Sequence, residues 1–244
     1  MDLSIIIFCY NEHGTIAHVA AEARQLAIAM GGSSEVIAVD DGSDDGTAEI
    51  LAAEPDIRYI RHAQNQGIGM ALRTGYAAAR CEYICAVPGD GQFDVRELMQ
   101  VQAFGFDAFY ALYRPQADYG PYRALLTRVN RFFNKHLLGL DMKDVNWIKV
   151  YRRDQLDYVK PELQSSIVES EICSKLQKAG IRPIELPSAY HSRTSGVAKG
   201  GNWKTLRKAI MEMWTLYTVT ERFARSIKIK NDSSGQPLAW IKEK

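Results

Sequence analysis

Two adjacent carboxylates at the end of a short apolar segment are the side chains best placed to do chemistry. Residues 39–47 read Val-Asp-Asp-Gly-Ser-Asp-Asp-Gly-Thr and follow the mainly apolar segment 35–38, which is typical of a buried strand. Open α/β sheets bind their ligands at the carboxyl ends of strands. Asp40 and Asp41 could there accept hydrogen bonds from a base or ribose, or hold a cation that in turn holds phosphates. An ordinary strand, turn and helix cap is the alternative interpretation of this segment alone.

Similar polar turns follow two other apolar segments, 4–9 and 83–87, and a glycine-containing turn opens a further predicted helix. The turns read Tyr-Asn-Glu at 10–12, Asn-Gln-Gly at 65–67 and Pro-Gly-Asp-Gly-Gln at 88–92. The sequence therefore predicts that one edge of a sheet carries Tyr10, Asp40, Gly67 and Asp90.

The elements that must position these turns alternate between strand and helix up to about Met99, which predicts an α/β fold with a mostly parallel central sheet and helices on both faces. The pattern beyond that point predicts strands at 108–113, 145–151 and 181–186, helices at 122–138, 166–179 and 203–225, a polar loop at 191–202, and a loose tail after Lys230.

The elements YNE, DDGS-x-DGT, N-x-G-x-x-x-A and DGQ, in this order and spacing, resemble the family-2 glycosyltransferases with a GT-A fold, especially the branch similar to dolichol-phosphate mannosyltransferase. The resemblance runs from about Ser4 to Gly196. It implies a Rossmann-like GT-A catalytic domain over residues 1–200, followed by an amphipathic helix and loose tail over 201–244. It also implies an inverting enzyme that takes a sugar from a nucleotide-diphosphate donor.

By this resemblance, Asp40 accepts from the base N–H, Glu12 lies near the ribose, and Asp90 and Arg193 are the catalytic residues. The full set implied for the donor is Tyr10, Asn11, Glu12, Asp40, Asp41, Gly67, Asp90, Arg193 and Lys199.

The resemblance also implies a divalent cation, Mg²⁺ or Mn²⁺, that neutralises the departing diphosphate. The family's D-x-D-x-Q pattern reads here as Pro88, Asp90 and Gln92. Asp90 and Gln92 can offer oxygen ligands, whereas Pro88 has no side-chain ligand. Either the cation is held more weakly than in relatives, or the enzyme depends less on it.

The resemblance implies that the phosphate of the acceptor is bound by Arg114, Arg123 and Thr127. A lipid phosphate is already anionic and needs no strong base. Because the sequence has no clear acidic pair before the predicted helix 166–179, a polyprenyl phosphate acceptor is favoured. A sugar hydroxyl of a surface polysaccharide is the alternative, and it would need a carboxylate base. The candidate bases are Glu169, Glu171 and Asp144. A third hypothesis is a protein that binds sugar nucleotides but has lost catalysis, because Pro88 stands where the family pattern has an aspartate.

Composition agrees with a cytoplasmic enzyme. The 244 residues are 46% hydrophobic and carry a net charge of +1, which argues against nucleic acid as a partner. The four cysteines lack paired CxxC spacing, and neither a signal peptide nor a bilayer-spanning segment is recognised.

The last predicted helix is amphipathic, with basic residues beside its apolar face, so it predicts either peripheral contact with the inner membrane face or packing on its own domain. The predicted apolar face consists of Trp203, Leu206, Ile210, Met213, Trp214 and Tyr217.

Overall fold

The computed structural model describes residues 1–31, 33–115, 134–189 and 203–234. In this part of the chain one seven-stranded sheet has the order β3-β2-β1-β4-β6-β5-β7. The strands are β1 (Leu3–Cys9), β2 (Glu35–Asp40), β3 (Ile57–Arg61), β4 (Tyr83–Pro88), β5 (Ala108–Tyr113), β6 (Lys149–Arg152) and β7 (Arg182–Pro187). β6 runs antiparallel to β4 and β5, and the other neighbouring pairs are parallel, so the predicted mostly parallel sheet is confirmed.

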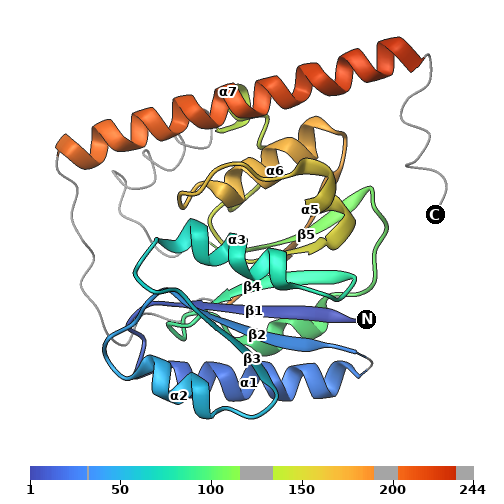
Figure 1. Cartoon of the computed structure of the whole chain (residues 1–244). Helices are drawn as coiled ribbons and strands as arrows, with labels where there is room; N and C mark the ends of the chain where they lie inside the picture. Colours follow the sequence, from blue (N-terminus) through green and yellow to red (C-terminus); the bar gives the residue numbers. More distant parts are fainter. Residues whose placement is uncertain (32, 116–133, 190–202, 235–244) are drawn as a thin grey trace.

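Helices cover both faces of this sheet (Figure 1). They are α1 (Ile16–Met30), α2 (Thr47–Ala53), α3 (Ile68–Ala78), α5 (Arg153–Val159), α6 (Val168–Lys178) and α7 (Trp203–Ser234), with a 3₁₀ helix η1 (Val95–Gln100). Alternation along β1 produces two cores, because Ile5 and Ile7 pack in the cluster that contains α1, whereas Ile6 packs in the cluster that contains α3 and α6. Gly75 allows α3 to lie directly on Ile6.

Two predicted boundaries differ from the structure by several residues. β6 begins at Lys149 rather than at residue 145, because the preceding residues form a turn in which the Asp144 side chain accepts from the Asn146 N–H at 3.0 Å. The last helix continues past Arg225 to Ser234, so residues 231–234 are helical rather than part of a loose tail. Residues 134–138 of the predicted helix 122–138 are helical, and its remainder lies outside the described residues, as do the predicted loop 191–202 and residues 235–244. β3, η1 and α5 are elements that the sequence pattern did not single out.

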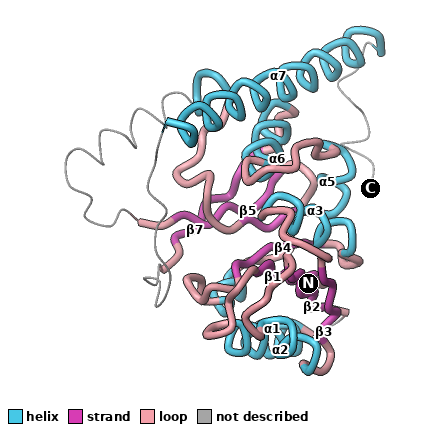
Figure 2. Tube along the Cα trace, turned by 60° about the vertical axis from the view of Figure 1, so that its left-hand side comes forward, coloured by secondary structure: helices cyan, strands magenta, loops and turns pink. Residues whose placement is uncertain are grey.

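The long helix α7 lies beside α6 on the outer side of the fold (Figures 1 and 2). Its Leu216 is buried, and Glu221 forms an ion pair with Lys178 of α6 at 2.6 Å. The predicted apolar face divides in the structure, because Met213 and Tyr217 pack against the core whereas Trp214 is 68% exposed. The side chains of Trp203, Leu206 and Ile210 lie outside the described part of the structure.

Candidate functional site

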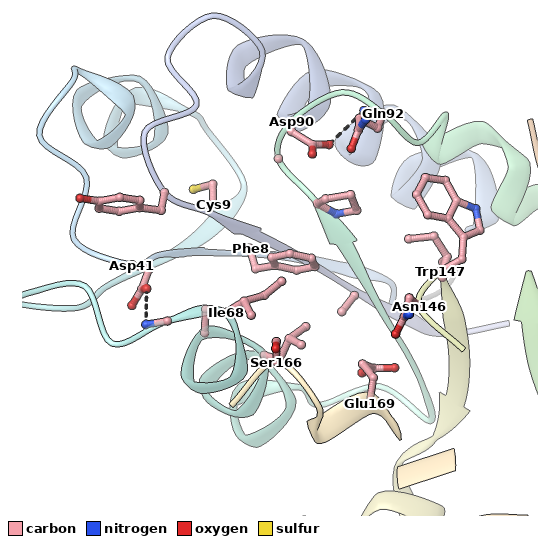
Figure 3. A pocket seen from close by; sticks show the side chains of 18 of the residues that line it. Phe8, Cys9, Asp41, Ile68, Asp90, Gln92, Asn146, Trp147, Ser166 and Glu169 are labelled. Atoms are coloured by element: carbon pink, nitrogen blue, oxygen red, sulfur yellow. Dashed lines mark hydrogen bonds between the residues drawn. The ribbon is translucent and has the colours of Figure 1, made fainter. Parts of the chain in front are cut away.

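A cleft of about 690 Å³ opens at the carboxyl ends of β1, β2 and β4 (Figure 3). Its other walls are the start of α3, the turn before β6 and the start of α6. This is the edge at which α/β sheets bind ligands. Its polar and charged lining consists of Tyr10, Glu12, Asp41, Asn65, Tyr76, Asp90, Gln92, Arg114, Asn146, Trp147, Lys149, Ser166 and Glu169.

Asp41 lines the cleft and is held by donors from the segment that leads into α3. Its carboxylate accepts from the backbone N–H of Gln66 at 2.9 Å and of Gly67 at 2.7 Å. The Nδ1 atom of His62 lies 2.7 Å from the same carboxylate. Three donors thus fix one carboxylate on the wall of the cleft, and the predicted position of Gly67 at this edge is part of the arrangement.

Asp40 faces the opposite way and is fully buried. It accepts from the N–H and hydroxyl of Ser43 at 2.9 and 2.5 Å and from the hydroxyl of Tyr59 at 3.1 Å, and Arg61 lies 3.5 Å away. Burial and the charge of Asp40 raise the pKa of Tyr59 to about 12. Asp40 is not among the residues that line the cleft, whereas its neighbour Asp41 is. The base contact at Asp40 stays a prediction from the resemblance.

The Tyr-Asn-Glu turn divides its residues between ligand-facing and structural positions. Tyr10 and Glu12 line the cleft, and Tyr10 is 44% exposed. Asn11 adopts a left-handed conformation with φ of 57°, and its side-chain amide exchanges two hydrogen bonds with Asp44, at 2.8 and 3.0 Å. Asn11 therefore ties this turn to the acidic turn after β2.

The turn after β4 brings Asp90 and Gln92 into the cleft beside Pro88. Gly89 lies so close to β1 that an added Cβ would be 2.8 Å from Cβ of Cys9, which presses the turn against the neighbouring strand. Asp90 accepts from the N–H of Gln92 at 3.1 Å. Within the described residues, no group of three or more His, Cys, Asp or Glu side chains could hold a metal ion. One carboxylate and one amide oxygen fit Mg²⁺ or Mn²⁺ only where diphosphate oxygens or water complete the coordination.

Arg114 and Asp144, predicted separately as a phosphate ligand and a candidate base, form an ion pair. Nε of Arg114 lies 2.8 Å from the Asp144 carboxylate, and its guanidinium stacks 4.6 Å from the ring centroid of Trp147. Arg114 and Trp147 line the cleft, whereas Asp144 lies behind them. Much of the Arg114 charge is therefore already balanced by protein.

Glu169 enters the cleft from the first turn of α6 and is surrounded by buried side chains. It accepts from the hydroxyl of Tyr76 and, at 2.8 Å, from that of Tyr151, and Nζ of Lys149 lies 3.9 Å away. Burial, together with the charge of Glu169, holds the pKa of Tyr76 well above its usual range. Tyr76, Tyr151 and Lys149 come from α3 and β6 and belong to no short motif, so sequence reasoning missed them. His62 and Trp147 were missed for the same reason.

Glu171, the third candidate base, has a structural position. It is fully buried, accepts from the N–H groups of Glu162 and Leu163 at 2.9 and 2.8 Å, and pairs with Lys175 at 2.6 Å. It is not among the residues that line the cleft. These contacts anchor the segment before α6 to that helix.

Four predicted site residues lie outside the described residues: Arg123, Thr127, Arg193 and Lys199.

The family model described as "Glycosyl transferase family 2" matches residues 4–155. The chain is 28% identical over 160 residues to an undecaprenyl-phosphate 4-deoxy-4-formamido-L-arabinose transferase of Shewanella sediminis, which covers 62% of this chain and 48% of that protein. It is 26% identical over 199 residues to glycosyltransferase AglJ of Haloferax volcanii, covering 77% of this chain and 62% of that protein. The chain thus spans about half to three-fifths of the length of these two relatives.

Among solved structures, the UDP complex of glucosyl-3-phosphoglycerate synthase from Mycobacterium tuberculosis matches with a TM-score of 0.62 and 17% identity, covering 89% of this chain and 80% of that one. Another structure of that synthase contains Mn²⁺, UDP and phosphoglyceric acid. At this identity the likeness concerns the fold alone, and it confirms the predicted GT-A-like α/β architecture. Within the described residues, no helix combines the length and the apolar character needed to cross a bilayer.

Proposed function

The chain belongs to glycosyl transferase family 2, and on that premise we propose that it is an inverting enzyme that moves a sugar from a nucleotide-diphosphate donor to a polyprenyl phosphate. The observation that carries the proposal is the convergence of Asp41, Asp90 and Gln92 on one cleft at the carboxyl ends of β2 and β4. This arrangement offers an acceptor for a base N–H on one side and oxygen ligands for a diphosphate-bound cation on the other.

In the proposed donor half of the cleft, each turn has a separate role. Tyr10, Asp41 and Glu12 line this half of the cleft, and Tyr10 is 44% exposed. In the proposal Tyr10 packs beside the base, Asp41 accepts from a base N–H, and Glu12 accepts from a ribose hydroxyl. Asp90 and Gln92 would hold Mg²⁺ or Mn²⁺, which supplies positive charge against the departing diphosphate when it is bound. Arg193 and Lys199 complete the donor site in the proposal, on the evidence of the sequence resemblance.

The acceptor is proposed to be a polyprenyl phosphate for two reasons. The motifs resemble the branch similar to dolichol-phosphate mannosyltransferase, and the matched Shewanella protein is named as an undecaprenyl-phosphate transferase. Arg114 lines the cleft on the side away from Asp41 and is suited to a phosphate because its planar fork can donate to two oxygens. Arg123 and Thr127 would make further contacts with the acceptor phosphate.

A sugar hydroxyl acceptor is the second candidate, and Glu169 is the observation that favours it. Its side chain is 18% exposed, and it lines the cleft as a carboxylate that could take a hydroxyl proton. Two tyrosine hydroxyls already donate to it, so its position is fixed but part of its accepting capacity is used.

One assay separates these functions. The full chain is incubated with radiolabelled UDP-, GDP-, dTDP- or CDP-sugars, Mn²⁺ and either undecaprenyl phosphate or a polysaccharide acceptor, and the product is extracted into organic solvent. We expect label in the organic phase that depends on the lipid phosphate and falls on addition of EDTA. Label that appears only in an aqueous polysaccharide product would favour the hydroxyl acceptor. Nucleotide-sugar binding without turnover under any condition would indicate a binding protein.

A lipid acceptor requires the chain to work at a membrane, and we propose peripheral contact with the inner membrane face through α7. The outward side of this helix carries Trp214, which is 68% exposed, Met211, which is 59% exposed, and the exposed Arg225. The exposed Arg222 pairs with Glu162 of the domain. Binding to anionic vesicles should weaken as salt is raised, because the basic part of the attraction is screened. Trp214→Ser should weaken co-sedimentation. Absence of vesicle binding at low salt would contradict this proposal.

A further inference from the structure

The hydrogen bonds of Asp41 limit what this carboxylate can still accept. An ionised carboxylate has about four acceptor positions, two on each oxygen. Oδ1 of Asp41 is contacted by Nδ1 of His62 at 2.7 Å and by the N–H of Gln66 at 2.9 Å. Oδ2 accepts from the N–H of Gly67 at 2.7 Å. One acceptor position, on Oδ2, therefore remains for a ligand in the cleft.

His62 is the side chain that fills Oδ1 and prevents it from accepting a second ligand donor. Its ring is only 8% exposed, and its backbone N–H donates to the carbonyl of Asp40 at 2.9 Å, which fixes its place at the end of β3. Because the carboxylate only accepts, Nδ1 must carry the hydrogen in this contact. Nε2 lies 2.9 Å from the hydroxyl of Thr74 on α3, which can donate or accept. The ring is thus held at both nitrogens.

The common bases differ in how many adjacent donors their pairing edge presents. Uracil and thymine present a single imide N–H between two carbonyl oxygens. Guanine presents two neighbouring donors, a ring N–H and an amino group, and both would need acceptors. Cytosine and adenine present a ring nitrogen acceptor at the centre of this edge, which a carboxylate repels. A carboxylate with one remaining acceptor position therefore matches the imide of uracil or thymine.

We propose that His62 is a specificity-determining residue, which occupies Oδ1 of Asp41 and thereby restricts the donor to a uracil or thymine nucleoside diphosphate sugar. The inference rests on the proposed function, since it assumes that Asp41 meets the base of the donor. His62 does not touch the ligand itself and acts through Asp41 as a positioning residue. Asn65, which lines the cleft beside the donors of Asp41, has an amide that suits a neighbouring base carbonyl.

The test is calorimetric titration of the full chain with UDP, dTDP, GDP and CDP in the presence of Mn²⁺. We expect UDP or dTDP to bind at least about tenfold more tightly than GDP and CDP, because a second donor or a facing acceptor would stay unpaired in the site. In His62→Leu, UDP affinity should fall by about tenfold with the loss of a charge-assisted contact, and the preference over GDP should shrink to about threefold or less.

Rescue and control variants separate this role from a general structural one. His62→Asn places an amide N–H near the Nδ1 position and should keep the preference for UDP over GDP, whereas His18→Asn, at an exposed position on α1, should change neither affinity nor preference. If His62→Leu does not fold, His62→Gln, whose amide reaches towards Nε2 instead of Nδ1, provides the same loss of the contact.

The outcomes are distinct. GDP or CDP binding as tight as UDP in the unaltered chain would overturn the inference while leaving the proposed function intact. A folded His62→Leu or His62→Gln variant that keeps the full preference would overturn the role of His62. Binding of none of the four diphosphates would overturn the proposed function, and the inference with it.

Discussion

The two sides of the cleft, which we propose to bind the donor and the acceptor, are held by different kinds of contact. On the donor side, Asp41 is fixed mainly by backbone N–H groups of the segment that leads into α3, and the turns after β1 and β2 are tied together by Asn11 and Asp44. On the acceptor side, Glu169 is fixed by side chains from α3 and β6, and Arg114 is paired with Asp144. These donor-side contacts thus join residues of the predicted motifs to one another, whereas the tyrosines that hold Glu169 on the acceptor side belong to no motif.

The two sides also differ in how far their charged side chains are already paired within the protein. Asp90 and Gln92 on the donor side can share a cation with an incoming diphosphate. On the acceptor side the charges of Arg114 and Lys149 already face carboxylates, at 2.8 and 3.9 Å. A phosphate acceptor therefore competes with protein carboxylates for Arg114, and the proposed lipid phosphate relies on further basic residues such as Arg123.

The largest expected effect is on the donor side. Asp90→Ala removes the one carboxylate of the Pro88–Gln92 turn that lines the cleft, so the departing diphosphate would lose the charge that balances it. We expect transfer to fall at least about 100-fold, the scale typical of lost transition-state electrostatic contacts, with an unchanged melting temperature. Glu49→Ala, an exposed substitution on α2, is the matched control. Near-normal transfer in Asp90→Ala would refute the assignment of this turn to the diphosphate.

A smaller effect is expected from the ion pair on the acceptor side. Arg114→Ala should raise KM for the lipid phosphate by about tenfold or more, since a charge-assisted contact contributes about 1.5–3 kcal/mol, and should leave donor binding nearly unchanged. Initial rates with each substrate varied in turn measure the two constants.

Asp144→Asn provides the matched test because it removes the protein carboxylate that competes for Arg114. It should lower KM for the lipid phosphate by a few-fold and leave kcat unchanged. A large fall in kcat would instead identify Asp144 as the base of a hydroxyl acceptor reaction, and weakened donor binding in Arg114→Ala would reverse the assignment of the two sides.

The smallest expected effect on transfer concerns the side chains that hold Glu169. Tyr151 is fully buried, and its hydroxyl donates to Glu169 at 2.8 Å, so Tyr151→Phe leaves the carboxylate with one donor fewer. We expect a loss of about 1–3 kcal/mol in the free energy of unfolding, measured by urea titration, because a buried polar contact is lost. Transfer to lipid phosphate should change only modestly. A large fall in kcat would show that Glu169 takes part in the reaction and would favour the hydroxyl acceptor.

Sequence reasoning predicted the part of the fold in which strand and helix patterns alternate strictly. β1, β2, β4 and β5 lie close to their predicted positions because each is a short, mainly apolar run. β7, which contains Arg182 and Glu185, begins one residue after its predicted start. β6 was placed four residues too early, because the alternating pattern continues through a turn in which side chains, including that of Lys149, bond the backbone carbonyls. The extension of α7 to Ser234 was missed because Asn, Asp and Ser residues are poor helix formers by local propensity.

The sequence by itself determined which turns line the cleft, because glycines, carboxylates and amides at strand ends act through local backbone geometry. Both Asp40 and Asp41 were predicted from the sequence to contact the donor. Only the tertiary structure decided which of the two lines the cleft, because that depends on where β3 and α3 pack around the end of β2. It likewise brought His62 to Asp41 and Tyr151 to Glu169, contacts that no local pattern encodes because the partners meet only when separate elements pack together.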